Sequence, residues 1–245
     1  MTHHFADANV LAEAVAGRWL DELATAGPAG RPLTVALSGG RITKQFFAEV
    51  VTQSQARHLA LDRVHFFWAD ERCVPPTDPE SNFRLASELL FEPLKIAAGQ
   101  IHRLIGEADP EWAAREAGLD LERFAPANDQ GQPVMDWIFL GMGEDGHVAS
   151  LFPGAGPEVW DCESPFLVIR DSPKPPPTRI SLSSKVIAAA QQVWVLASGS
   201  GKEQALRDSL APGGRTPLGR IMGLRGKTQV FTELKVGGEG EQAGV

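Results

Sequence analysis

Several residue types and patterns are scarce in this sequence of 245 residues, and each scarcity narrows its possible functions. Tyrosine does not occur, which excludes a tyrosine acid, base or nucleophile. The two cysteines, Cys73 and Cys162, show neither the spacing of a zinc site nor the density of a disulfide framework. There is no run of 18 apolar residues, and the first residues lack the basic and apolar regions of a secretory signal. We therefore expect a soluble, cytoplasmic protein without a membrane partner.

Basic residues are the minority among the charged ones. The chain has 23 Lys and Arg against 31 Asp and Glu, a net charge of -8, and a pI near 5.3. A nucleic-acid surface needs a basic face that displaces counterions. We expect a small-molecule ligand and no nucleic acid, and any bound phosphate must meet a local cluster of donors.

The order of apolar patterns predicts an α/β fold. Short β-branched or aromatic runs alternate with stretches of helical periodicity, which is typical of βαβ units and a doubly wound, mostly parallel sheet. Strands are predicted at 33–37, 64–68, 137–140, 166–169, 180–183, 193–197 and 229–232. Helices are predicted at 6–26, 44–54, 82–90, 110–124, 184–190 and 202–210. An apolar content of 43% is enough for one domain over residues 1–236, and the polar tail 237–245 is predicted to be disordered.

The turn after the first predicted strand can bind an anion. Ligands of parallel sheets bind outside the carboxyl ends of the strands. Here the strand 33–37 is followed by four residues that lead into a helix: Ser38, Gly39, Gly40 and Arg41. Glycines let the backbone approach a ligand, and a helix start offers free N–H groups, so a phosphate suits this turn. An ordinary tight turn is the alternative.

Three charged residues follow the second predicted strand, 64–68. They are Asp70, Glu71 and Arg72. At the mouth of a cleft, a carboxylate and a guanidinium can orient a substrate. Solvated loop charges, or charges that cap a helix, are the alternative.

A glycine-rich stretch, G-M-G-E-D-G over 141–146, follows the strand 137–140 and satisfies the G-x-G-x-x-G pattern of a dinucleotide-binding turn. Glu144 and Asp145 would, however, place two negative charges beside a pyrophosphate, and Pro153 leaves little room for the required helix. We interpret the stretch as a turn that presents Asp145 and His147. His147 is predicted to be a general base whose tautomer Asp145 fixes, with a structural histidine as the alternative.

Two further cationic residues, Arg179 and Lys202, are candidates for binding a ligand. Arg179 comes after three prolines, and Lys202 ends the stretch Ser-Gly-Ser-Gly-Lys. This stretch resembles the end of a Walker A loop, but Leu196 replaces a required glycine and Glu203 replaces the magnesium-binding Ser or Thr. We predict that Lys202 and Arg179 bind a small phosphate group. A salt-bridged surface cation is the alternative for each.

Together these segments resemble the 6-phosphogluconolactonase family, in the superfamily shared with glucosamine-6-phosphate deaminase. The matching blocks are ALSGG, FFWADERCVPPTDPESN, WIFLGMGEDGHVASLFPG, PPTRISLS and GSGK, in family order. The resemblance implies a Rossmann-like three-layer α/β/α sandwich. It also implies hydrolysis of 6-phospho-D-glucono-1,5-lactone to 6-phosphogluconate in the oxidative pentose phosphate pathway, without a metal or cofactor.

The resemblance also assigns roles to residues. It implies that His147 is the base, with Asp70, Arg72 and Asp145 around the reacting end. The phosphate group would be surrounded by Ser38, Gly39, Gly40, Arg179 and Lys202. The family turn resembles S-G-G-S-T-P, so Arg41 is a departure, and we assign it to the phosphate as well.

Two other functions are compatible with these blocks. One is a glucosamine-6-phosphate deaminase/isomerase, which usually reads D-E-Y where this chain has Asp70-Glu71-Arg72, and whose Asn-Glu pair after D-G-H is missing here. The other is a sugar-phosphate sensor that binds without turnover. The Asp145 and His147 pair favours an enzyme.

Overall fold

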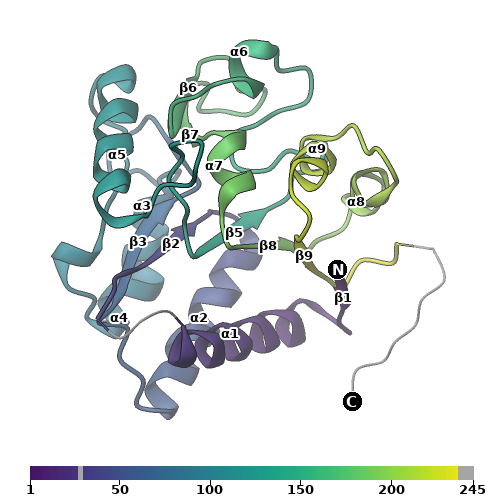
Figure 1. Cartoon of the computed structure of the whole chain (residues 1–245). Helices are drawn as coiled ribbons and strands as arrows, with labels where there is room; N and C mark the ends of the chain where they lie inside the picture. Colours follow the sequence, from purple (N-terminus) through teal and green to yellow (C-terminus); the bar gives the residue numbers. More distant parts are fainter. Residues whose placement is uncertain (27–29, 237–245) are drawn as a thin grey trace.

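The protein is built on a six-stranded parallel sheet (Figure 1). The structure, a computed structural model, describes residues 1–26 and 30–236. Along the sheet the strand order is β1 (Thr2–His4), β9 (Gln229–Thr232), β8 (Gln192–Ala197), β5 (Trp137–Gly141), β2 (Leu33–Leu37) and β3 (Val64–Trp68). All five residues of β2 are buried, because a parallel sheet is covered on both faces.

Helices cover both faces of this sheet, which gives the predicted Rossmann-like α/β/α sandwich. The longer helices are α1 (Ala8–Thr25), α2 (Arg41–Ala56), α5 (Pro110–Phe124), α8 (Glu203–Leu210) and α9 (Pro217–Leu224). The shorter ones are α3 (Asn82–Ala86), the π-helix η1 (Ser87–Phe91), α4 (Glu92–Leu94), the 3-10 helix η2 (Ala98–Gln100), α6 (Pro157–Trp160) and α7 (Ser184–Ala189). Figure 1 shows α1 and α2 together on one face, with α7 and α9 on the other.

A second, antiparallel sheet lies beside the first one. Its strand order is β4 (Asp70–Arg72), β7 (Arg179–Leu182) and β6 (Phe166–Ile169), and α5 packs against it. The sequence predicted strands at 166–169 and 180–183, but not that they leave the parallel sheet. The pairing with β4 explains this, because that strand follows β3 after one residue and turns the chain away from the main sheet.

Most predicted elements are confirmed within a few residues, and the differences have physical causes. Helix α2 begins at Arg41, three residues before the predicted start, because the chain enters the helix directly from Gly40 at φ +116°. Sequence patterns missed β1 and β4, which are too short to show an apolar alternation, and α9, which contains two glycines. The predicted disordered tail lies outside the described residues.

The direction of winding locates the site. From β2 the chain continues through α2 to β3 on one side, while β5 lies on the other side of β2. Such a reversal of strand order opens a crevice at the carboxyl ends of the two strands. No helix within the described ranges is long and apolar enough to cross a membrane.

Candidate active site

The turn after β2 lies at this reversal and is held from two sides. The Ser38 hydroxyl donates to the Phe139 carbonyl oxygen of β5 at 2.8 Å. The Asn82 side chain lies where a Cβ on Gly39 would be, and its amide donates to the Asp70 carbonyl oxygen at 2.9 Å. Only glycine therefore fits at position 39, the Ser38 hydroxyl proton is engaged, and the backbone of Gly40 at the start of α2 is exposed.

The turn after β5 folds back over its own backbone. The Gly143 N–H donates to the His147 carbonyl oxygen at 2.9 Å, and a Cβ on Gly143 would overlap the His147 ring. Gly146 adopts φ +78° beside Thr216. The next helix along the chain begins only at Pro157, so this turn does not lead directly into a helix as a dinucleotide-binding turn does. The glycines here make room for a histidine.

His147 and Asp145 form a close pair. The imidazole Nδ1 lies 2.5 Å from Asp145 Oδ1, and the ring packs 4.7 Å from that of Phe152. Among the described residues, Nε2 has no hydrogen-bond partner. The bond to the carboxylate assigns the ring proton to Nδ1, which leaves the Nε2 lone pair free.

Electrostatics favour the neutral form of this histidine. Burial of the ring lowers the pKa of His147, and the hydrogen bond and charge of Asp145 oppose this lowering without cancelling it. Burial is the largest single effect on Asp145 and acts to raise its pKa, but the hydrogen bonds and the charge of His147 together outweigh it, so this pKa is lowered. The pair therefore combines a neutral imidazole with an ionised carboxylate near neutral pH.

The short strand β4 divides its three charges between two faces. Successive side chains of a strand point to opposite sides, so Asp70 and Arg72 share one face and Glu71 the other. The buried Asp70 carboxylate accepts from the Ser150 hydroxyl at 2.7 Å and lies 3.9 Å from the Arg179 guanidinium. Its charge acts to raise the pKa of His147, so Asp70 belongs to the same site.

Glu71, on the other face of β4, has a structural role. Its carboxylate accepts from the N–H groups of Asn82 at 2.8 Å and Phe83 at 2.7 Å, at the start of α3. Burial raises the pKa of Glu71. Glu71 therefore follows the alternative of a charge that caps a helix, and it does not orient a substrate at the mouth of the cleft.

The two arginines of this small sheet are differently engaged. Arg72 donates through Nη1 to the Glu80 carbonyl oxygen at 2.7 Å, while its buried Nε has no partner in the described part of the chain. Arg179 lies over the Phe152 ring and donates to three carbonyl oxygens of the proline-rich loop, those of Lys174, Pro175 and Pro176. In the structure Arg179 holds this loop, and its contact with a phosphate stays a prediction.

A second group of cations gathers around the turn after β8. The Arg41 guanidinium lies against Gly199, where a Cβ would be 3.2 Å from Nη2. Burial, and then the charge of Arg41, lower the pKa of the Lys202 ammonium group, and Lys174 adds to this lowering. These cations converge on one side of the crevice, which is the arrangement a doubly charged phosphate group requires.

Lys174 is a site residue that sequence reasoning missed. It lies in a segment predicted only as a polar, proline-rich loop, and its charge reaches both His147 and Lys202. The Ser172 hydroxyl donates to its carbonyl oxygen at 2.8 Å, which fixes the backbone of the loop. Lys174 reaches the site because the loop folds over it. The sequence of such a loop has no periodic pattern, so its path could not be predicted.

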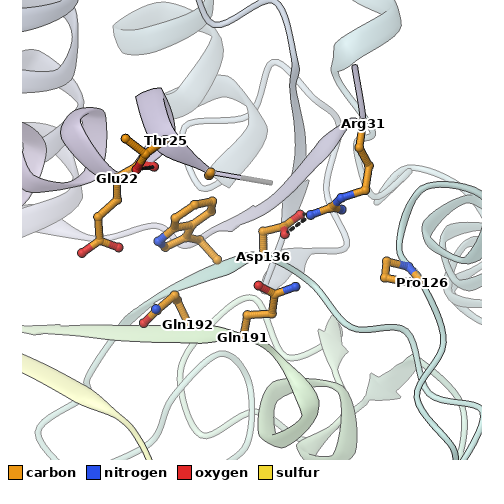
Figure 2. A pocket seen from close by; sticks show the side chains of 9 residues that line it. Glu22, Thr25, Arg31, Pro126, Asp136, Gln191 and Gln192 are labelled. Atoms are coloured by element: carbon orange, nitrogen blue, oxygen red, sulfur yellow. Dashed lines mark hydrogen bonds and ion pairs between the residues drawn. The ribbon is translucent and has the colours of Figure 1, made fainter. Parts of the chain in front are cut away.

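A cavity of about 500 Å³ at the opposite end of the sheet is a different feature (Figure 2). Arg31 and Asp136 form an ion pair in its wall, just before β2 and β5 begin. It therefore lies at the amino ends of the strands, away from His147. In the described ranges no group of three or more His, Cys, Asp or Glu side chains is arranged to hold a metal ion.

A doubly wound sheet with a histidine–carboxylate pair and converging cations at its crevice defines an enzyme of the Rossmann-like α/β class. Residues 6–230 match the family model described as glucosamine-6-phosphate isomerases/6-phosphogluconolactonase. The chain belongs to this family.

Similar proteins agree with this assignment. The 6-phosphogluconolactonase of Haemophilus influenzae is 37% identical over 177 residues, which are 72% of this chain and 73% of that protein. The Streptomyces coelicolor protein of the same name is 32% identical over 231 residues, which are 92% of this chain and 88% of that protein. The crystal structure of 6-phosphogluconolactonase from Leishmania guyanensis superposes with a TM-score of 0.80 at 27% identity, covering 95% of each chain.

Proposed function

We propose that this protein hydrolyses 6-phospho-D-glucono-1,5-lactone to 6-phosphogluconate, a step of the oxidative pentose phosphate pathway, without a metal or cofactor. The observation that carries the proposal is the His147–Asp145 pair, 2.5 Å apart, with a free Nε2 beside the cluster of cations. The names of relatives up to 38% identical support the choice of lactone over an amino sugar.

The phosphate group is bound at the side of the crevice formed by Lys202, Arg41 and the turn at Gly39 and Gly40. A guanidinium offers bidentate hydrogen bonds, and an ammonium group adds a compact charge. This grip holds the sugar so that its C1 lies beside His147, which converts binding energy at a remote group into orientation at the reacting carbon. Arg179, predicted to bind the phosphate, contributes by holding the proline-rich loop.

Hydrolysis then proceeds in two proton-coupled steps. His147 Nε2 takes a proton from a water molecule as the water oxygen bonds to the lactone carbonyl carbon. In the tetrahedral intermediate the bond from this carbon to the ring oxygen breaks, and the imidazolium returns the proton to that oxygen. The product is an acid, which ionises near neutral pH.

The charges on the shared face of β4 assist the first step. The Arg72 guanidinium has an unpartnered buried Nε that can donate to the oxyanion as it forms. Asp70 stabilises the imidazolium through its charge and holds Ser150 at 2.7 Å. Asp145 keeps the ring in the tautomer that exposes Nε2.

A lactone assay tests this proposal directly. Acid release from freshly prepared lactone is measured against the spontaneous rate, and ammonia release from glucosamine 6-phosphate is measured in parallel. We expect catalysed acid release and no ammonia. Ammonia release would instead support the deaminase, and phosphosugar binding without hydrolysis would support a sensor.

Two further expectations concern the binding partners and the cellular location of the enzyme. We propose a small-molecule substrate and no nucleic-acid partner, which the net charge of -8 supports. A cytoplasmic location is supported by two cysteines that form no disulfide.

A further inference from the structure

Glu233 reaches from the end of one strand to the turn after its neighbour. It follows β9, and because Ala197 of β8 pairs with Thr232, Glu233 comes to lie beside Ser198. Its Oε1 accepts hydrogen bonds from the Ser198 hydroxyl and from the Gly199 N–H, both at 2.8 Å. The carboxylate thus binds the first two residues of the turn that leads to Lys202.

This turn needs external support to hold one shape. Gly199 has φ +100° and Gly201 has φ +88°, and glycines lose more conformational freedom on folding than other residues. On the other side of the turn, Glu203 accepts from the Gly201 N–H at 2.9 Å. Two carboxylates therefore fix the turn from opposite sides, and they occupy the N–H groups of both glycines. The contact with an incoming phosphate falls to Lys202 and Arg41.

The second oxygen of Glu233 has an unusual environment. Oε2 is buried, and no described residue forms a hydrogen bond with it. An unpaired buried carboxylate oxygen is costly. The nearby cation that offsets this cost is Lys202, whose pKa the charge of Glu233 raises against the effect of burial. Glu144, whose charge has the larger effect on the pKa of Lys202, is exposed, whereas Glu233 is half-buried and its Oε2 is fully enclosed.

We propose that Glu233 is a positioning residue that holds the turn 198–201 so that Lys202 faces the phosphate group of the substrate. This rests on the proposed function for the identity of the substrate. Glu233 itself does not touch the phosphate, since a carboxylate would repel it. It acts through the backbone of Gly199, the hydroxyl of Ser198 and the charge of Lys202.

Two substitutions in the full-length protein separate this role from a general structural one. Glu233→Ala removes both hydrogen bonds and the charge, whereas Glu233→Gln keeps an acceptor for Ser198 and Gly199 and removes only the charge. We expect Glu233→Ala to raise KM for the phospholactone about 10-fold, as loss of a charge-assisted contact does, with kcat within about 3-fold of the wild type. Glu233→Gln should raise KM by about 3-fold.

A matched control is Glu163→Ala, which removes an exposed carboxylate that pairs with Lys185 outside the site. It should leave KM and kcat unchanged. Circular dichroism and the melting temperature show whether each variant is folded, and if Glu233→Ala does not fold, the KM of Glu233→Gln decides. Unchanged KM in the folded Glu233 variants, or a fall in kcat at unchanged KM, would overturn the proposal.

Binding of inorganic phosphate separates this proposal from the proposed function. The shift of the melting temperature with inorganic phosphate is measured for the wild type and for Glu233→Ala. We expect a weaker phosphate response in the variant, even if the wild type does not hydrolyse the lactone, in which case only the proposed function fails. Equal responses of the two proteins would contradict the role of Glu233.

Discussion

Arg72 and Arg179 are register partners, directly opposite each other across the antiparallel strands β4 and β7. Like charges in this relationship repel, so such a pair is stable only when anions surround it. Here Glu80 binds Arg72 and Asp70 lies beside Arg179. The two guanidinium groups share one face of the small sheet and place positive charge on the side where Asp70 also lies.

Arg179→Ala is expected to destabilise the fold by about 3 kcal/mol, because it leaves the buried Asp70 without the cation beside it and the carbonyl oxygens of Pro175 and Pro176 without their donor. Arg72→Ala should cost less, since its partner Glu80 is exposed. Urea unfolding of both variants measures the difference in the free energy of unfolding. Arg179 is 3% exposed. An equal loss of unfolding free energy in the two variants would show that this burial does not set the contribution of Arg179 to stability.

His147→Ala should lower kcat by roughly 10²- to 10⁴-fold, which is the contribution of a positioned general base. Binding of inorganic phosphate should change little, because the cations around Lys202 are untouched. Initial rates above the spontaneous hydrolysis and the phosphate-dependent melting temperature measure the two effects. Near-normal turnover would exclude His147 as the base.

The pH profile of kcat/KM should report the titration of this histidine. The neutral ring is the active form, and burial lowers its pKa below 6.5, so activity should persist below pH 6.5 and be lost at lower pH. Asp145 acts to raise this pKa, so Asp145→Asn should move the inflection to still lower pH. The same variant should lower kcat by about 10²-fold or more, since the tautomer is no longer fixed. An inflection that moves to higher pH would contradict the pairing.

Gly143→Ala should reduce kcat while the protein stays folded. Its backbone conformation is open to alanine, but the added Cβ would overlap the His147 ring and displace it. A misplaced catalytic group typically costs about 10²-fold. Gly223→Ala is the matched control, since a Cβ there meets no atom within 4 Å, and it should have wild-type kcat. Steady-state kinetics of the two variants provide the comparison.

Arg41→Ser introduces the serine that the family turn S-G-G-S-T-P has at this position. If Arg41 binds the phosphate, KM should rise by about 3- to 10-fold with kcat retained, as for a partly exposed charge-assisted contact. Lys185→Ala removes a cation outside the site and should leave KM unchanged. An unchanged KM for Arg41→Ser would show that this guanidinium faces solvent during turnover.

The parts of the protein that the sequence predicts are those set by local patterns. Strand β2 was predicted with its observed ends because a buried parallel strand is a continuous apolar run, and the Asp145–His147 pair follows from one glycine-rich turn. The roles of Asn82 and Glu233 depend on contacts with Gly39 and Gly199, which are far away in the chain. No local pattern encodes such contacts, so sequence reasoning found the histidine–carboxylate pair but not the residues that hold the turns.

The packing of Asn82 on Gly39 also bears on how this family can diverge. An alanine at position 39 would require a smaller residue at position 82, and that exchange would remove the amide that holds Asp70 at 2.9 Å. Positions 39 and 82 are therefore expected to change together in the lineage or not at all. A descendant that loses this glycine would have to find another support for the backbone of Asp70, which constrains the order in which new substrate specificities can evolve.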